Sequence, residues 1–394
     1  MKKLFSFLKL EKEKKKDFLV FDIGSGRIKG LILEKEGGKN RVKRFASKSF
    51  ERFGIFQTAV FEKDLLERTL SQVIGELKSG DKLLPKSILV GLSPEMLKGR
   101  TTTLSFKRSS PERIIEEEEE KIILDLVLDK SQRKVAKRFG EIYKIAPSEF
   151  QVLKKEVIET KISGYKVSSI LGKKGKLFDF EILVIFTLKN YLKIFNLIKK
   201  SFIFKEAILV HEVEGLISWL KNKKNFSGTF IDIGSRFTQF FLVKDGLLKW
   251  MGEFEEGGDI FTQVLSENLG LTQKEAEDLK LRFSKEELSS GSKKIIEGIL
   301  AQPLNFWFNR LKQELKECGD FVFPQGFYLF GGGSLLPGIK KILRNGDWGD
   351  RSGLPTLNFP KVKFILPRDL PVEDKSGFLK GPQETGIIFL ALSV

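Results

Sequence analysis

Cysteine and histidine are nearly absent from this chain of 394 residues, which contains one of each, Cys318 and His211. A disulfide within the chain is therefore impossible, which fits a reducing compartment. A zinc site built from cysteine and histidine is excluded for the same reason. A hydrolase of the Ser-His-Asp or Cys-His type would depend on His211. That residue follows the apolar run 207–210 and precedes Glu212, a context that favours a structural role.

Long apolar runs are also missing. No stretch reaches the roughly 18–20 residues that a transmembrane helix needs, and the short apolar part of the N-terminus is interrupted by Lys9, unlike a cleaved signal peptide. Hydrophobic residues still make up 41% of the chain and charged residues 31%. The length and composition predict two large lobes with buried cores.

The net charge of +17 points to nucleic acid or to an anionic membrane surface. Lysine far outnumbers arginine and is spread along the whole chain. Readers of nucleic acid rely on arginine for bidentate contacts, so no nucleic-acid partner is expected.

The N-terminal segment 1–16 is basic and amphipathic, with seven lysines against two glutamates. On a helix, Met1, Leu4, Phe5 and Leu8 fall on one face. This pattern is typical of a short helix lying on an anionic membrane, held through residues 1–10. A basic tail without regular structure is the alternative.

The pattern further along alternates short apolar strands with helices. A helix is expected over 62–78 and a buried strand over 87–93. A charged helix is expected to start at Pro111 and run to 140, followed by strands within 150–187. These last segments predict a small helix-plus-sheet module inside a larger fold.

An internal repeat is the most informative feature of the sequence. Residues 18–33 read FLVFDIGSGRIKGLIL and residues 229–243 read TFIDIGSRFTQFFLV. Each is an apolar strand, a turn with aspartate and glycine, and a returning strand. The duplication predicts two similar halves that face each other.

The two turns carry residues suited to binding phosphate. Glycines at a strand end bring backbone N–H groups towards an anion, a serine adds a hydroxyl, and a lysine adds a point charge. An aspartate can hold Mg²⁺ through water, because Mg²⁺ keeps most of its hydration shell. The first turn offers Asp22, Gly24, Ser25 and Lys29, and the second Asp232, Gly234 and Ser235.

A third turn, Gly331, Gly332, Gly333 and Ser334, lies between a predicted strand and a helix that starts near Pro337. The N-terminus of that helix favours negative charge. The ordered set of turns resembles the phosphate-1, phosphate-2 and adenosine motifs of the superfamily of actin, sugar kinases and heat-shock chaperones, across residues 17–394. The resemblance implies an α/β, actin-like (ribonuclease H-like), duplicated two-lobed fold that binds ATP and Mg²⁺ between the lobes.

The resemblance also assigns roles to single residues. Glu212 resembles the acid that positions the attacking water, and Asp22 and Asp232 resemble the acids that hold Mg²⁺ through water. Glu277 and Lys280 resemble ribose contacts, and Gly257 and Gly258 the glycine pair after the second phosphate turn. One departure is Arg236-Phe237, where many relatives have a small residue and then threonine. This departure implies at most a weak ATPase.

The inserted module is similar to the subdomain that sets the FtsA family apart from actin and MreB, and PilM of type IV pili has a comparable insert. The expected boundaries are a basic segment at 1–16, a first lobe at 17–105 and 187–226, an FtsA-type subdomain inserted in it at 106–186, a second lobe at 227–379 with a helical subdomain at about 256–325, and a closing element at 380–394 that packs on the first lobe.

The FtsA resemblance implies a scaffold at the inner face of the cytoplasmic membrane that forms homo-oligomers or filaments and docks FtsZ or other division proteins. FtsA usually ends in a membrane helix, whereas this sequence stops at Val394, so segment 1–10 is expected to take over that role. A PilM-like component of pilus assembly is the first alternative. A small-molecule kinase of the same superfamily is the second, although no further Asp or His cluster indicates a substrate base.

Overall fold

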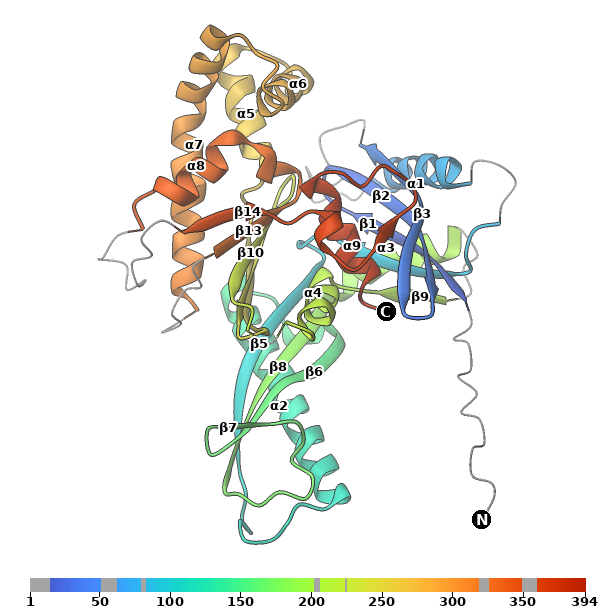
Figure 1. Cartoon of the computed structure of the whole chain (residues 1–394), viewed down its shortest axis with the longest axis vertical. Coiled ribbons are helices and arrows are strands. Elements are labelled where there is room, and N and C mark those ends of the chain that lie inside the picture. The colour runs from blue at the N-terminus through green and yellow to red at the C-terminus, as the bar shows by residue number, and fades with distance from the viewer. Residues whose placement is uncertain are drawn as a thin grey trace, which may run out of the picture.

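The computed structural model describes residues 15–50, 62–78, 83–201, 206–223, 225–318, 326–348 and 360–394. The amphipathic segment predicted over 1–16 therefore lies almost entirely outside the described residues. Figure 1 shows two sheets side by side with helices around them, and a third sheet that projects away from both. Among the described helices, none is long and apolar enough to cross a membrane.

The sheet of the first lobe has six strands in the order β15-β3-β2-β1-β4-β9. β1 pairs antiparallel with β2 and parallel with β4. Leu19, Val20 and Phe21 of β1 are fully buried, as expected for a strand covered on both faces. The strands and helices of this lobe are β1 Lys16–Ile23, β2 Arg27–Glu36, β3 Lys39–Ser49, α1 Lys63–Leu77, β4 Ser87–Leu92, α3 Lys189–Ser201, β9 Glu206–Leu209, α4 Glu212–Leu220, β15 Glu373–Asp374 and α9 Thr385–Ala391.

The sheet of the second lobe repeats this arrangement with five strands in the order β12-β11-β10-β13-β14. β10 pairs antiparallel with β11 and parallel with β13, as β1 does with β2 and β4. The duplicated two-lobed fold predicted from the repeat is thus confirmed. The elements are β10 Gly228–Ile233, β11 Thr238–Lys244, β12 Leu247–Phe254, α5 Gly258–Leu269, α6 Gln273–Ser284, α7 Ser290–Lys316, β13 Gly326–Phe330, α8 Pro337–Asn345 and β14 Lys361–Phe364.

The inserted module is the third sheet, with strand order β5-β8-β6-β7 and helix α2 packed against it. It has its own core, in which Phe178, Phe180 and Phe186 are buried. Figure 1 shows it extending away from the two lobes. Its elements are β5 Leu97–Lys107, α2 Glu117–Tyr143, β6 Phe150–Ile162, β7 Tyr165–Val167 and β8 Leu177–Leu188.

The helix predicted to start at Pro111 starts instead at Glu117, so that prediction was wrong by six residues. The guanidinium of Arg108 donates to the carbonyls of Arg113 and Ile114 and pairs with Glu119. The Ile115 amide donates to the Lys173 carbonyl at 2.9 Å. These contacts hold residues 111–116 as a turn against the loop before β8, and the helix can begin only after them.

Helix α4 is capped by His211. The Val213 amide donates to its Nδ1 at 3.1 Å, and Glu214 completes the capping box. Burial lowers the pKa of His211 to about 4, which keeps Nδ1 unprotonated and able to accept that hydrogen bond. This is the structural role that the sequence predicted.

Helix α9 crosses α4 at Gly215. A Cβ on Gly215 would lie 1.7 Å from the carbonyl oxygen of Phe389. Phe389 is fully buried, and its ring meets those of Trp219 and Phe330 edge to face. The last helix is therefore seated in the core of the first lobe, beside the strand that ends at Ile23.

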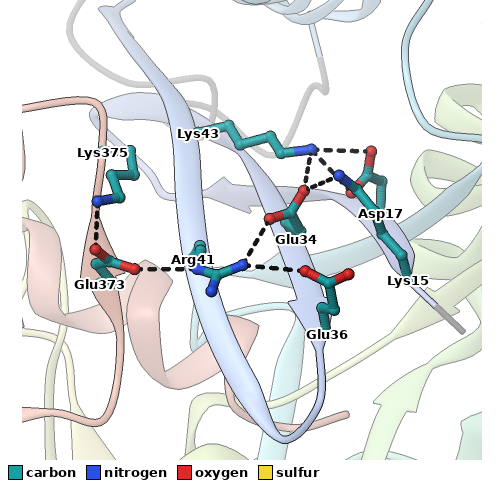
Figure 2. A network of polar contacts seen from close by, with 8 residues as sticks. All are labelled: Lys15, Asp17, Glu34, Glu36, Arg41, Lys43, Glu373 and Lys375. Atoms are coloured by element: carbon teal, nitrogen blue, oxygen red, sulfur yellow. Dashed lines mark hydrogen bonds and ion pairs between the residues drawn. The ribbon is translucent and has the colours of Figure 1, made fainter. Parts of the chain in front are cut away.

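A network of ion pairs ties the C-terminal segment to the first-lobe sheet (Figure 2). Glu34 on β2 pairs with Lys15, Lys43 and Arg41, and Arg41 also pairs with Glu373 of β15 at 3.0 Å. Hydrogen bonds from Lys15 and Lys43 lower the pKa of Glu34 to about 2. Ion pairs on this face of the sheet thus join β2 and β3 to each other and to β15, in the segment that returns from the second lobe.

Buried ion pairs join the insert to β12 of the second lobe. Lys98 and Arg100 on β5 both contact the carboxylate of Glu253, at 2.8 and 2.5 Å, and the Glu253 side chain is only 2% exposed. Further along β12, Lys249 contacts Glu159 and Glu181 of the insert at 2.5 and 2.7 Å. The insert therefore contacts β12 at both Lys249 and Glu253. The chain continues from the end of β12 at Phe254 to Gly257 and Gly258.

Candidate functional site

Both glycine turns are closed by an equivalent backbone hydrogen bond. In the first, the Gly24 amide donates to the Arg27 carbonyl at 3.1 Å, and in the second the Gly234 amide donates to the Phe237 carbonyl at 2.9 Å. A Cβ on Gly24 would lie 3.3 Å from that carbonyl oxygen, which leaves little room for a side chain. Each turn joins two antiparallel strands at the end of a lobe's sheet.

The tips of the two turns touch across the lobes. The Arg236 amide donates to Oγ of Ser25 at 3.2 Å, a contact between residues 211 positions apart. A Cβ on Gly26 would lie 2.6 Å from Oγ of Ser235. The sequence predicted that the two turns face each other, and the structure brings them into contact.

Three carboxylates and one ammonium gather behind the turns. Lys29 Nζ contacts Asp22 at 2.8 Å. Burial raises the pKa of Asp232 to about 7, with the Asp22 carboxylate adding to the shift and Lys29 opposing it. Burial, and then Asp232 and Asp22, raise the pKa of Glu212 well above its ordinary value. Burial and mutual repulsion therefore disfavour the charged forms of Asp232 and Glu212, and Lys29 offsets only part of this effect.

Glu212 has an unsatisfied oxygen. Its Oε1 is buried and accepts no hydrogen bond within the described part of the chain, whereas most buried polar atoms have a partner. Gly386 of α9 lies beside the other oxygen, where a Cβ would come within 3.3 Å of Oε2. A buried oxygen without a hydrogen-bond donor is a point at which a polar ligand or an ordered water can bind.

The glycine pair 257–258 packs against the second turn. The Gly258 amide donates to the Gly234 carbonyl at 2.9 Å, and the Asp259 amide to the Ser235 carbonyl at 2.8 Å. A Cβ on Gly257 would lie 2.4 Å from the Ser235 oxygen, so only glycine fits there. The start of α5 and the second turn thus form one unit.

The third turn also packs against the second hairpin, next to the glycine pair. Gly331 has φ +80°, and a Cβ there would lie 2.0 Å from Oδ1 of Asp232. The hydroxyl of Ser334 donates back to the Gly331 carbonyl at 2.6 Å and closes the short helix η2, Gly332–Leu335. A Cβ on Gly332 would meet no described atom within 4 Å, so backbone is exposed at this point. The backbone can therefore approach a flat ligand here.

Lys280 on α6 reaches the glycine pair, and Glu277 on the same helix pairs with Lys280 and accepts a hydrogen bond from Thr262. Lys280 Nζ donates to the Gly258 carbonyl at 3.0 Å and to Oγ1 of Thr262 at 2.7 Å, and contacts Glu277 at 2.6 Å. Lys280 is 8% exposed, and the Glu277 side chain is 33% exposed. Lys280 is occupied by internal contacts, and the ribose contacts expected of this pair stay predictions.

Two residues at the site were not predicted from the sequence. Asp259 accepts a hydrogen bond from the Ser235 hydroxyl at 2.5 Å, and its place directly after the glycine pair was an available signal. Glu95, in the loop after β4, lies 3.4 Å from the Arg236 guanidinium. No spacing or motif in the sequence links Glu95 to Arg236, because they come from different lobes.

The residues fit a bound nucleotide on observations of this structure. Glu212 has an unmet oxygen, and the backbone at Gly332 is open to a ligand, whereas the glycines at 24, 257 and 331 pack against the chain's own atoms. Within the described ranges, no three or more Asp, Glu, His or Cys side chains form a direct metal site. Binding of Mg²⁺ by Asp22 and Asp232 through water stays a prediction.

The fold defines the class: the chain is an actin-like, two-lobed α/β protein with an inserted sheet. Its sequence is 22% identical to the cell division protein FtsA of Streptococcus pneumoniae over 343 residues, which are 82% of this chain and 72% of FtsA. The solved PilM-PilN type IV pilus biogenesis complex has a chain that superposes with a TM-score of 0.67 at 17% identity, covering 95% of this chain and 97% of that one.

Other matches are more distant. The ethanolamine utilization protein EutJ of Carboxydothermus hydrogenoformans matches with a TM-score of 0.49 and 13% identity over 97% of this chain and 90% of that one. No family model matches. From these comparisons, the chain is similar to FtsA in sequence and shares its fold with a chain of the PilM-PilN complex.

Proposed function

We propose that the chain is an ATP-binding scaffold that assembles at the inner face of the cytoplasmic membrane and tethers division proteins. The observation that carries this proposal is the contact of the two glycine turns, Ser25 Oγ with the Arg236 amide, beside a buried acidic cluster. The similarity to FtsA over most of the chain supports a role in division over other roles of actin-like proteins.

ATP with Mg²⁺ is the ligand that fits the site. The Gly24 and Gly234 amides close their own turns. A phosphate would therefore be met by the hydroxyl of Ser25 at the tip of the first turn and by the charge of Lys29, which pairs with Asp22 at 2.8 Å. Asp22 and Asp232 would hold Mg²⁺ through water. The third turn at 331–334 presents exposed backbone to the adenosine, and Glu277 is the proposed ribose contact. When bound, the nucleotide supplies the phosphate charge that joins the two lobes.

Binding is favoured over fast hydrolysis. Burial, and then Asp232 and Asp22, raise the pKa of Glu212, which disfavours the charged form that would act as a base towards water. Phe237 adds bulk in the second turn, at the position where many actin-like proteins have threonine. We therefore infer at most a weak ATPase activity, with the nucleotide serving to set the shape of the scaffold.

Membrane attachment is assigned to residues 1–10, which lie outside the described ranges. The amphipathic pattern and the basic charge of the segment support this assignment. Assembly into a homo-oligomer would strengthen weak attachment of each subunit through multivalency. A partner such as the acidic tail of FtsZ would suit the net charge of +17.

Vesicle sedimentation tests the proposed function. With ATP and Mg²⁺, the full chain is expected to pellet with vesicles that contain anionic lipid, and to lose this binding at high salt. A chain lacking residues 2–12 is expected to stay in the supernatant. Equal pelleting of the two chains would show that the segment is not the anchor.

A role in pilus assembly is the second candidate, because the solved PilM-PilN structure shares the fold over 95% of this chain. The same vesicle pellets separate the two roles. If vesicle-bound protein recruits FtsZ, the role in division is supported. If it recruits PilN and not FtsZ, the role in pilus assembly takes the place of the role in division.

A further inference from the structure

Arg236 occupies the point where the two phosphate turns meet. Its amide donates to Ser25 Oγ of the first turn at 3.2 Å, and it belongs to the second turn itself. The residue directly before it, Ser235, would touch a Cβ on Gly26. Whatever binds between the turns is therefore bound next to the base of the Arg236 side chain.

The guanidinium is held by carboxylates of both lobes. Nη2 contacts Glu255, directly after β12, at 2.5 Å, and Nη1 contacts Glu95, in the loop after β4, at 3.4 Å. The Arg236 side chain is 31% exposed, that of Glu95 22% and that of Glu255 59%. The pair with Glu255 lies at the surface, whereas the pair with Glu95 is the more enclosed and the longer of the two.

The contact with Glu95 is the weaker of the two and the one that a stronger anion can displace. Burial raises the pKa of Glu95, with Arg236 only partly offsetting this effect. Burial therefore disfavours the charged carboxylate, which is the form that attracts Arg236. Arginine binds phosphate oxygens bidentately and with charge assistance, so a phosphate at the turn is a better partner than a carboxylate at 3.4 Å.

We propose that Arg236 is the residue that distinguishes ATP from ADP, by exchanging Glu95 for the terminal phosphate of the bound nucleotide. The inference rests on the proposed function, since it assumes that the turns bind a nucleotide. In the ADP state Arg236 keeps Glu95 and joins the lobes by an ion pair. In the ATP state that ion pair is replaced by a contact with the ligand.

A purely structural role of Arg236 predicts a different result. If Arg236 only fastens the lobes through Glu95, then loss of either partner loosens the site alike, and ATP and ADP are affected equally. Under the exchange, loss of Arg236 and loss of Glu95 have opposite effects on the preference for ATP. The sign of the two changes therefore separates the roles.

Competition of ATP and of ADP against a fluorescent nucleotide, with Mg²⁺ present, tests the proposal on the full chain. Wild type is expected to prefer ATP. Arg236→Gln is expected to weaken ATP binding by about tenfold or more while ADP changes by less than about threefold. Glu95→Gln is expected to raise the ATP-to-ADP preference, because the competing carboxylate is gone. Arg41→Gln, which removes a guanidinium of similar exposure paired with carboxylates on β2 and β15, is the matched control and should leave both affinities unchanged.

Equal weakening of ATP and ADP in Arg236→Gln, or a fall in ATP preference in Glu95→Gln, would overturn the exchange while leaving nucleotide binding intact. A wild-type chain that binds neither nucleotide would overturn the proposed function along with the inference. Thermal melting of each variant without nucleotide shows whether it is folded. If Arg236→Gln is unfolded, the direction of the change in Glu95→Gln alone supports or overturns the exchange.

Discussion

Replacing Glu253 with glutamine is expected to lower the free energy of unfolding by about 3–5 kcal/mol, because it leaves two buried cations without their partner. Lys98 lies 2.8 Å and Arg100 2.5 Å from the Glu253 carboxylate, and the three side chains are 11%, 22% and 2% exposed. A glutamine of the same shape can accept a hydrogen bond but cannot neutralise either charge. Urea unfolding of the two proteins measures the difference.

The matched control is Glu317→Gln. Glu317 also joins the insert to the second lobe, through Arg138 at 3.3 Å, but its side chain is 62% exposed and that of Arg138 is 58% exposed. An exposed pair of this kind contributes about 0–1 kcal/mol. Similar losses in the two variants would mean that burial of the Glu253 cluster does not determine its contribution.

The effect of Glu253→Gln should also depend on pH. Burial alone raises the pKa of Glu253, but Arg100 and Lys98 lower it to about 2, below its ordinary value of 4.5. A carboxylate whose pKa is depressed by folding contributes stability above its unfolded pKa and loses it as the pH falls through the folded value. The difference in the free energy of unfolding between wild type and variant is therefore at its maximum at pH 7 and decreases below about pH 4.5. A gap that stays constant down to about pH 3 would contradict this pKa.

Replacing Gly215 with alanine is expected to lower the free energy of unfolding by about 3 kcal/mol, at the upper end for overpacked sites. The new Cβ would lie 1.7 Å from the backbone oxygen of Phe389, so relief requires α4 and α9 to separate. Neither side-chain rotation nor solvent can absorb the clash. Because α4 begins at Glu212 and α9 contains Gly386, the shift would also disturb the acidic cluster.

Gly298→Ala is the control for this prediction. Gly298 lies within α7, and a Cβ there would meet no described atom within 4 Å. Alanine in an open helical position stabilises by about 1 kcal/mol relative to glycine. Thermal or urea unfolding should therefore give changes of opposite sign for the two substitutions, and a mild or stabilising Gly215→Ala would contradict the close crossing of α4 and α9.

Much of the fold was predictable because its central pattern occurs twice in the chain. The strand, turn and strand of 18–33 and 229–243 recur in β1–β2 and β10–β11, with Asp22 opposite Lys29 in one register and Asp232 opposite Gln239 in the other. The start of α2 was not predictable. Pro111 and five successive glutamates favour a helix locally, but the tertiary contacts of Arg108 and Ile115 delay it to Glu117.

The candidate site divides in the same way. The glycines and aspartates of the three turns carry a local signal, since a strand end with aspartate and glycine can be read from the sequence. The contacts between residues from different parts of the fold have no such local signal in the sequence. Arg236 with Glu95 joins the two lobes, and Lys98 and Arg100 with Glu253 join the insert to the second lobe. These residues lie more than 140 positions apart, and only the packed structure shows which charges meet.

A nucleotide site between the two turns is tested by measuring the binding of ATP with Mg²⁺ to the full chain and to Asp22→Asn and Asp232→Asn. Asp245→Asn is the control, since Asp245 lies in an exposed turn of the second lobe with φ +53°, a conformation that asparagine adopts readily. We expect the wild type and Asp245→Asn to bind alike and each of the other variants to lose about tenfold or more in affinity. Absence of ATP binding by the wild type, or equal affinity in all four proteins, would contradict a nucleotide site at this position.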